Sequence, residues 1–123
     1  MAAITTATMT SKIGGRMITK IAAGVDADQK GLIGGTVDVF MAEVDNTANA
    51  STDCYFKIYN VAAPTFGDNA PDFIGEVRGG AKRTFTFLKG MTFATDLSFC
   101  VVTLGGTTGN SALSGVNVRI ITS

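Results

Sequence analysis

The chain is patterned as short runs of alternating apolar and polar residues that glycine-rich turns separate. Successive side chains of a strand point to opposite faces, and β-branched and aromatic residues favour strands. Six segments fit both criteria and are predicted to be strands: residues 36–44, 54–60, 73–78, 83–88, 96–104 and 116–122. In the second segment one face would enter the core and the other would face solvent, with Cys54, Phe56 and Ile58 on the first and Tyr55, Lys57 and Tyr59 on the second.

The first 35 residues alternate more weakly and hold six of the 15 glycines. We expect residues 1–35 to form edge strands or an extended arm, and residues 36–123 to form the body of the same domain. An amphipathic helix over residues 11–23 is the alternative, but Gly14 and Gly15 at its start disfavour it. The predicted fold is all-β: a single-domain antiparallel β-sandwich, jelly-roll-like, with an N-terminal strand or extended arm.

The composition suggests a protein partner. Hydrophobic residues make up 46% of the chain and charged residues 16%, which is more apolar than a typical soluble domain, so we expect another protein to cover part of the surface. Ten basic and ten acidic residues cancel, which argues against nucleic-acid binding. No apolar run is long enough to cross a membrane, and no signal peptide is evident. We therefore expect the chain to be made in the cytoplasm.

Candidate chemistry is sparse. The chain has no histidine, and histidine is the commonest general base and metal ligand. Asp26 and Asp28 begin a stretch with the spacing of a calcium loop, but Lys30 occupies its third ligand position and Val37 stands where that loop needs a glutamate. We predict a protein that is not an enzyme, with no catalytic residues, no metal and no cofactor.

The two cysteines, Cys54 and Cys100, both fall within predicted strands. Buried thiols in a cytosolic protein are usually reduced and act as small hydrophobic groups. A disulfide between them would need neighbouring strands with both side chains on one face, so pairing stays open as the alternative.

Two features are candidate partner contacts. Arg78, Lys82 and Arg83 bracket the turn at Gly79 and Gly80, so they would either contact an acidic patch on a partner or protect an exposed edge strand from aggregation. Phe66 lies in the proline-containing loop 61–72. There it would be either an interface anchor or a contact with a satellite part of the core.

The C-terminal half resembles a group of small phage virion proteins. The resemblance rests on a Tyr-Phe-Lys-Ile-Tyr strand at 55–59, an Ala-Pro-Thr-Phe-Gly-Asp loop at 63–68, Pro71, and the stretch 90–98, in which Gly90 begins a turn that leads through Phe-Ala-Thr to the penultimate strand. These are strand and turn features rather than chemistry. The resemblance implies a phage structural protein with a compact β-sandwich.

Among virion roles, the small neutral chain with excess apolar surface favours a capsid decoration (cement) protein, assembled in the host cytoplasm. Its expected partners are the major capsid protein and copies of itself, as a trimer or dimer. A tail, neck or fibre-associated component is the nearest alternative. A carbohydrate-binding β-sandwich is a further one, which would need exposed aromatic rings beside loop carboxylates, here Tyr55 and Tyr59 with Asp53.

Overall fold

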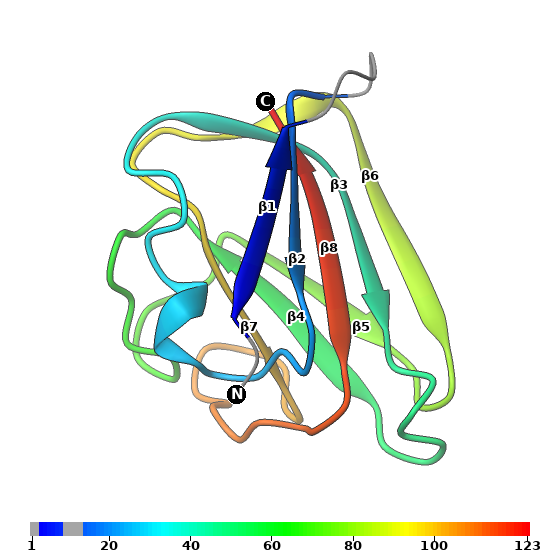
Figure 1. Ribbon diagram of the computed structural model, residues 1–123. Helices are drawn as coiled ribbons and strands as arrows, with labels where there is room; N and C mark the ends of the chain where they lie inside the picture. The colour runs from blue at the N-terminus through cyan, green and yellow to red at the C-terminus, as the bar shows by residue number, and fades with distance from the viewer. Residues whose placement is uncertain (1–2, 9–13) are drawn as a thin grey trace.

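The computed structural model describes residues 3–8 and 14–123, and in this part of the chain every long-range backbone ladder is antiparallel. Two sheets pack face to face (Figure 1), which confirms the predicted all-β sandwich. The large, five-stranded sheet has the order β1 (Ile4–Thr8), β2 (Arg16–Lys20), β8 (Asn117–Thr122), β3 (Val37–Asp45), β6 (Lys82–Phe93). The small, three-stranded sheet has the order β5 (Phe73–Val77), β4 (Cys54–Tyr59), β7 (Ser98–Val102).

The connections from β3 onward cross repeatedly between the sheets, as in a jelly roll. The chain runs from β3 in the large sheet to β4 and β5 in the small one, back to β6, across to β7, and back to β8. Residues 24–32 lie where a fourth strand of the small sheet would lie, because the Val101 amide donates to the Gly24 carbonyl and the Leu32 amide donates to the Leu97 carbonyl, each at 2.9 Å. This segment contains the short 3-10 helix η1 (Ala27–Gln29).

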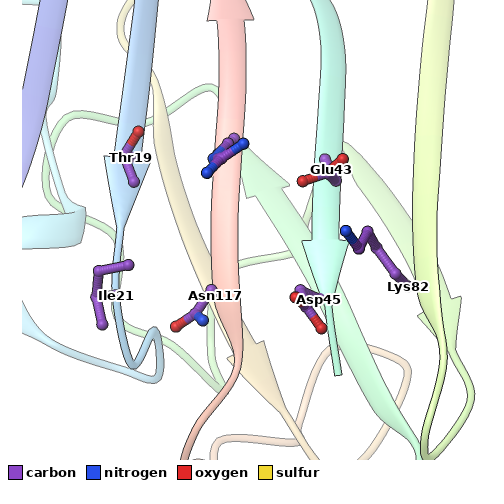
Figure 2. Close-up of a pocket in the computed structure, with 7 residues that line it drawn as sticks. Thr19, Ile21, Glu43, Asp45, Lys82 and Asn117 are labelled. Atoms are coloured by element: carbon purple, nitrogen blue, oxygen red, sulfur yellow. The ribbon is translucent and has the colours of Figure 1, made fainter. Parts of the chain in front are cut away.

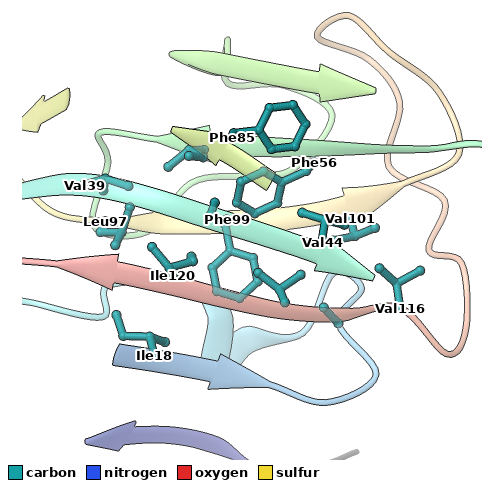
Figure 3. Close-up of a cluster of buried hydrophobic side chains, with 14 of the residues drawn as sticks. Ile18, Val39, Val44, Phe56, Phe85, Leu97, Phe99, Val101, Val116 and Ile120 are labelled. Atoms are coloured by element: carbon teal, nitrogen blue, oxygen red, sulfur yellow. The ribbon is translucent and has the colours of Figure 1, made fainter. Parts of the chain in front are cut away.

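The core lies between the two sheets and consists of the inward-facing half of each strand (Figure 3). Phe56 is at its centre, with ring centroids of Phe85, Phe99 and Phe73 6.2, 6.0 and 6.5 Å away. Burying one such side chain contributes about 1.5–3 kcal/mol. The alternation in the sequence predicted these positions because a sandwich buries one face of each strand.

The small sheet differs from the prediction in that the outer face of β4 and β7 is largely buried as well, although Ile74 and Glu76 on the outer face of edge strand β5 are exposed. Lys57 and Tyr59, expected to face solvent, are fully buried, and Tyr55 is half-buried. A second apolar cluster forms on this outer face from Tyr59, Phe66, Cys100 and Val102, with Val25, Tyr55 and Val61 packed against it. Loops 60–72 and 103–115 contribute to this cover, since Phe66 lies in the first and Gly109, which accepts a hydrogen bond from Lys57, lies in the second.

The edge strand β6 is longer than predicted, because it continues past Leu88 to Phe93. The register between β3 and β6 shifts at Phe40, between Val39 and Met41, and such a bulge allows pairing to resume beyond an irregularity. Gly90 lies at this point with φ +81°, and a Cβ there would be 3.0 Å from the Phe40 ring. The stretch from Gly90, predicted to be a turn, is therefore mostly strand.

The N-terminal region contributes strands to the large sheet. β1 pairs with β2 and β2 pairs with β8, so the helix considered for residues 11–23 is wrong over residues 16–20; residues 11–13 lie outside the described chain. The Lys20 side chain is fully buried, with its Nζ 3.1 Å from Asp26 and 3.0 Å from Asp28. Burial lowers the pKa of Lys20, but these carboxylates outweigh it and raise the pKa. Asp26 and Asp28 thus bind a lysine of this chain.

The two cysteines are free and lie on opposite faces of the small sheet. Cys54 belongs to the core between the sheets, whereas Cys100 belongs to the outer cluster. Burial raises the pKa of Cys54 to about 11 and also raises the pKa of Cys100. Both thiols are therefore protonated and structural at neutral pH.

Among the described residues, no helix is long and apolar enough to cross a membrane.

Candidate interaction surface

Lys82 and Arg83, which follow the turn between β5 and β6, do not form one patch. Lys82 and Arg83 are neighbours on a strand, so their side chains point to opposite faces. Arg83 reaches across to the small sheet, where its Nη1 donates to the Glu76 carbonyl at 2.8 Å and its guanidinium lies 4.6 Å from the Phe85 ring centroid. Lys82 instead lies beside Asp45 on the outer face of the large sheet.

Arg78 is exposed at the beginning of the turn that connects β5 to β6, which is fixed against loop 46–53. The Gly79 amide donates to the Asp53 carboxylate at 2.9 Å, and the Gly80 amide donates to the Asn49 carbonyl at 2.8 Å. A Cβ on Gly79 would lie 2.7 Å from the Thr52 amide nitrogen. These contacts fix the turn, so the backbone at Arg78 is held at a defined place.

Of the two alternatives for Phe66, the structure shows the contact with a satellite part of the core. It is only 8% exposed, its ring centroid lies 5.4 Å from that of Tyr59, and the Lys30 ammonium lies 4.8 Å above it. Such aromatic and cation–π contacts stabilise a side chain where it is. Phe66 therefore anchors loop 60–72 on the small sheet.

The outer face of the large sheet carries a charged half (Figure 2). Cross-strand registers place Arg119 between Thr19 and Glu43, and place Asp45 between Asn117 and Lys82. Together with Ile21, which is 52% exposed, these side chains line a shallow pocket of about 110 Å³. Charges of both signs alternate across it, so it has no net field for an ionic ligand.

The geometry around Asp45 fixes the charge at the end of this pocket. The hydroxyl of Thr47 donates to Asp45 at 2.6 Å and its amide donates at 3.0 Å. These hydrogen bonds, with smaller contributions from Lys82 and Arg119, lower the pKa of Asp45 below its usual value. Asp45 is therefore ionised at neutral pH.

The other half of the same face is apolar. One continuous row of paired residues crosses the sheet: Ala7 faces Met17, Met17 faces Ile121, and Ile121 faces Met41. Ala7 is exposed and the two methionines are half-buried, whereas Ile121 between them is 6% exposed. Phe40 lies beside this row, over Gly90. Outer faces of antiparallel sheets are usually polar, so this apolar row is a candidate contact surface.

The described residues lack a cluster of metal-binding side chains, and one of the two rings considered for carbohydrate binding is buried. Residues 3–8 and 14–123 contain no group of three or more acidic or cysteine side chains placed to hold a metal. Tyr59, one of the two rings considered for carbohydrate binding, is fully buried, and the hydroxyl of the other, Tyr55, donates to Glu76 at 2.9 Å. Tyr59 is therefore not open to stack on a sugar, whereas Tyr55 is half-buried.

Sequence reasoning identified Lys82 but missed the rest of this outer face. The alternation within residues 37–45 and 117–122 indicated which side chains face outward. What the sequence did not give is the register, which aligns Met17 with Ile121 and Met41 although these residues are far apart in the chain. No family model, no curated protein and no solved structure matches this chain.

Proposed function

We propose that this chain is a phage virion structural protein, most specifically a decoration or cement protein that binds the outside of a capsid shell. Its partners would be the major capsid protein and further copies of itself, in a virion assembled in the host cytoplasm. The observation that carries the proposal is the outer face of the large sheet. That face combines an apolar row through Met17, Ile121 and Met41 with alternating charges at Arg119 and Glu43.

Such a face suits a protein partner rather than a small ligand. The pocket on it is shallow, while the apolar row extends over four neighbouring strands. Burial contributes about 25 cal/mol per Å² of apolar surface, so one contact of this size is weak. Weak contacts become effective when a lattice repeats them and linked copies bind together, which is the situation of a shell protein.

The resemblance to small phage virion proteins gives the proposal its virion context, and its motifs are adjacent in the fold. The Asn60 side chain, at the end of β4, accepts the Thr95 amide at 2.8 Å, and the Ser98 hydroxyl donates to the Val61 carbonyl at 2.6 Å. Phe66 packs on Tyr59. The strand, loop and turn that resemble that group thus stabilise one another at the small sheet, which leaves the large sheet available for a partner.

The test is to count this chain in purified particles by mass spectrometry and then to assemble particles without it. A decoration protein is expected on the order of hundreds of copies per particle, because it follows the symmetry of the shell, and its removal should lower the thermal and mechanical stability of the head. A copy number equal to the number of subunits in one small ring would instead identify the tail, neck or fibre role. Particles that lack the chain and keep full stability would refute the cement function.

A further inference from the structure

We infer that β1 is the edge through which two copies of this chain pair, antiparallel, about a two-fold axis at Thr6. The inference rests on the proposed association of the chain with itself and adds the strand that mediates it. Pairing would join two five-stranded sheets into one continuous sheet. A two-fold contact of this kind is self-complementary, because the same residues lie on both sides of it.

β1 projects beyond the body of the sandwich. The large sheet has five strands, and the small sheet has three that residues 24–32 extend beside β7, so the small sheet covers the large one incompletely at β1. The register shows this directly: Ile18 in β2 is 1% exposed, whereas its partner Thr6 in β1 is exposed. Of the five residues of β1, only Ile4 is partly buried against the core. β1 is thus attached mainly by its ladder to β2, and no other part of the described chain pairs with its other edge.

The three other sheet edges each have a feature that hinders pairing with another chain. β6 carries Lys82, Arg83 and Lys89 and is itself irregular, because its residues 87–90 stand opposite the single residue Phe40 of β3. β7 is covered by residues 24–32, whose backbone hydrogen-bonds to it. β5 has Glu76, whose carbonyl already accepts a hydrogen bond from Arg83. Charges, bulges and covering segments are the usual protections of edge strands, and within the described residues 3–8 and 14–123 β1 has none of them.

A second copy is the occupant that fits the charges. The sequence of β1, Ile-Thr-Thr-Ala-Thr, contains no charged residue and no proline. Antiparallel pairing centred on Thr6 would place Thr5 opposite Ala7, and Ile4 opposite Thr8, of the other copy. No like charges would meet, and cross-strand pairs of β-branched residues are favourable. The same pairing through β6 would bring lysines and arginine together, which is unfavourable.

The geometry also connects this edge to the proposed shell contact. In an antiparallel pair with Thr6 opposite itself, residues that face outward in one copy pair with outward residues of the other. The apolar rows of both copies, each ending at Ala7, would therefore lie on the same side of the joined sheet. One dimer would present two copies of the contact face to the shell, which raises avidity without new contacts.

The test uses the purified full chain and two pairs of matched variants. Thr6→Lys places like charges opposite each other at the two-fold axis, and Thr84→Lys, at an exposed position of edge strand β6, is its control. Thr6→Cys and Thr84→Cys are treated with a short bismaleimide crosslinker; the native Cys54 and Cys100 are fully buried and should not react. Mass is measured by sedimentation over a concentration series, and circular dichroism checks that each variant is folded.

We expect the wild-type chain and Thr84→Lys to have the mass of a dimer, and Thr6→Lys to have the mass of a folded monomer. Crosslinking should give a covalent dimer with Thr6→Cys and not with Thr84→Cys. A wild-type monomer at every concentration, a trimer, or a dimer that survives Thr6→Lys would each overturn the inference. Incorporation into particles is read separately: Thr6→Lys monomers that still bind would leave the proposed function intact, and dimers that never bind would leave the edge pairing intact.

Discussion

The two sheets differ in how much of their outer faces is covered by loops. On the small sheet, loops 60–72 and 103–115 help to bury Tyr59, Lys57 and Cys100. On the large sheet, Arg119 and Lys82 are exposed, and Met17 and Met41 are half-buried. The long loops therefore complete the fold on one side only. The difference separates a face that stabilises the monomer from a face that is available to a partner.

The largest effect is expected where the small sheet is covered. Tyr59→Ala removes a fully buried ring that packs on Phe66. It also removes the hydroxyl that shares a hydrogen bond with the Cys100 sulfur at 3.6 Å. Truncating a large buried aromatic side chain typically costs about 3–5 kcal/mol, and urea unfolding should show a loss of this size. Tyr55→Ala, on the same face of the same strand but half-buried, is the control and should cost less. Equal losses would mean that the loops do not form a separate core layer.

The second prediction concerns Lys57, whose ammonium is buried in this layer and donates to the Gly109 carbonyl at 3.1 Å. Burial lowers the pKa of Lys57, and Cys100 opposes this effect without reversing it. Between the lowered pKa of the folded chain and the usual lysine pKa of 10.5, the unfolded chain binds more protons than the folded chain, so the stability due to Lys57 rises with pH.

Lys57→Met, which lacks the titrating group, tests this sign. As pH rises toward 10.5, the wild-type chain should gain stability relative to Lys57→Met, because the penalty for a buried charge disappears while the hydrogen bond to Gly109 can remain. The difference in urea midpoint between the two proteins, measured at neutral and at alkaline pH, isolates Lys57 from all other titrating groups. A difference that stays constant or moves the other way would show that the amine is solvated.

The sequence predicted the inner halves of both sheets and not the outer ones, for a physical reason. Alternation identifies which side chains share a face, and this was enough for the core around Phe56. It does not show what covers the opposite face, so Tyr55, Lys57 and Tyr59 were expected to face solvent although distant loops bury two of them fully. The sequence analysis grouped Lys82 and Arg83 as one candidate contact. The alternation of a strand already implied that their side chains point to opposite faces of the sheet.

The third prediction tests the open face. Met41→Glu introduces a charge into the apolar row at a half-buried position, where it should affect folding much less than Tyr59→Ala does. Binding to particles that lack the chain should weaken about tenfold or more, equivalent to about 1.4 kcal/mol. Thr108→Glu, at an exposed position in the loop region over the small sheet, is the control and should bind normally. Equal binding of both variants would place the contact elsewhere.

The smallest effect is expected in the charged half of the open face, at the cross-strand pair of Glu43 and Arg119. Opposite charges that face each other across a ladder contribute about 0.2–1 kcal/mol, and exposed pairs are screened by salt. A double-mutant cycle with Glu43→Gln and Arg119→Gln, measured by urea unfolding at low and high salt, should give a coupling in this range that decreases as salt is added. If these side chains instead contact the shell, each single variant should weaken particle binding by more than it changes stability. A coupling well above this range, insensitive to salt, would mean that the pair is buried and that this half of the face is as closed as the small sheet.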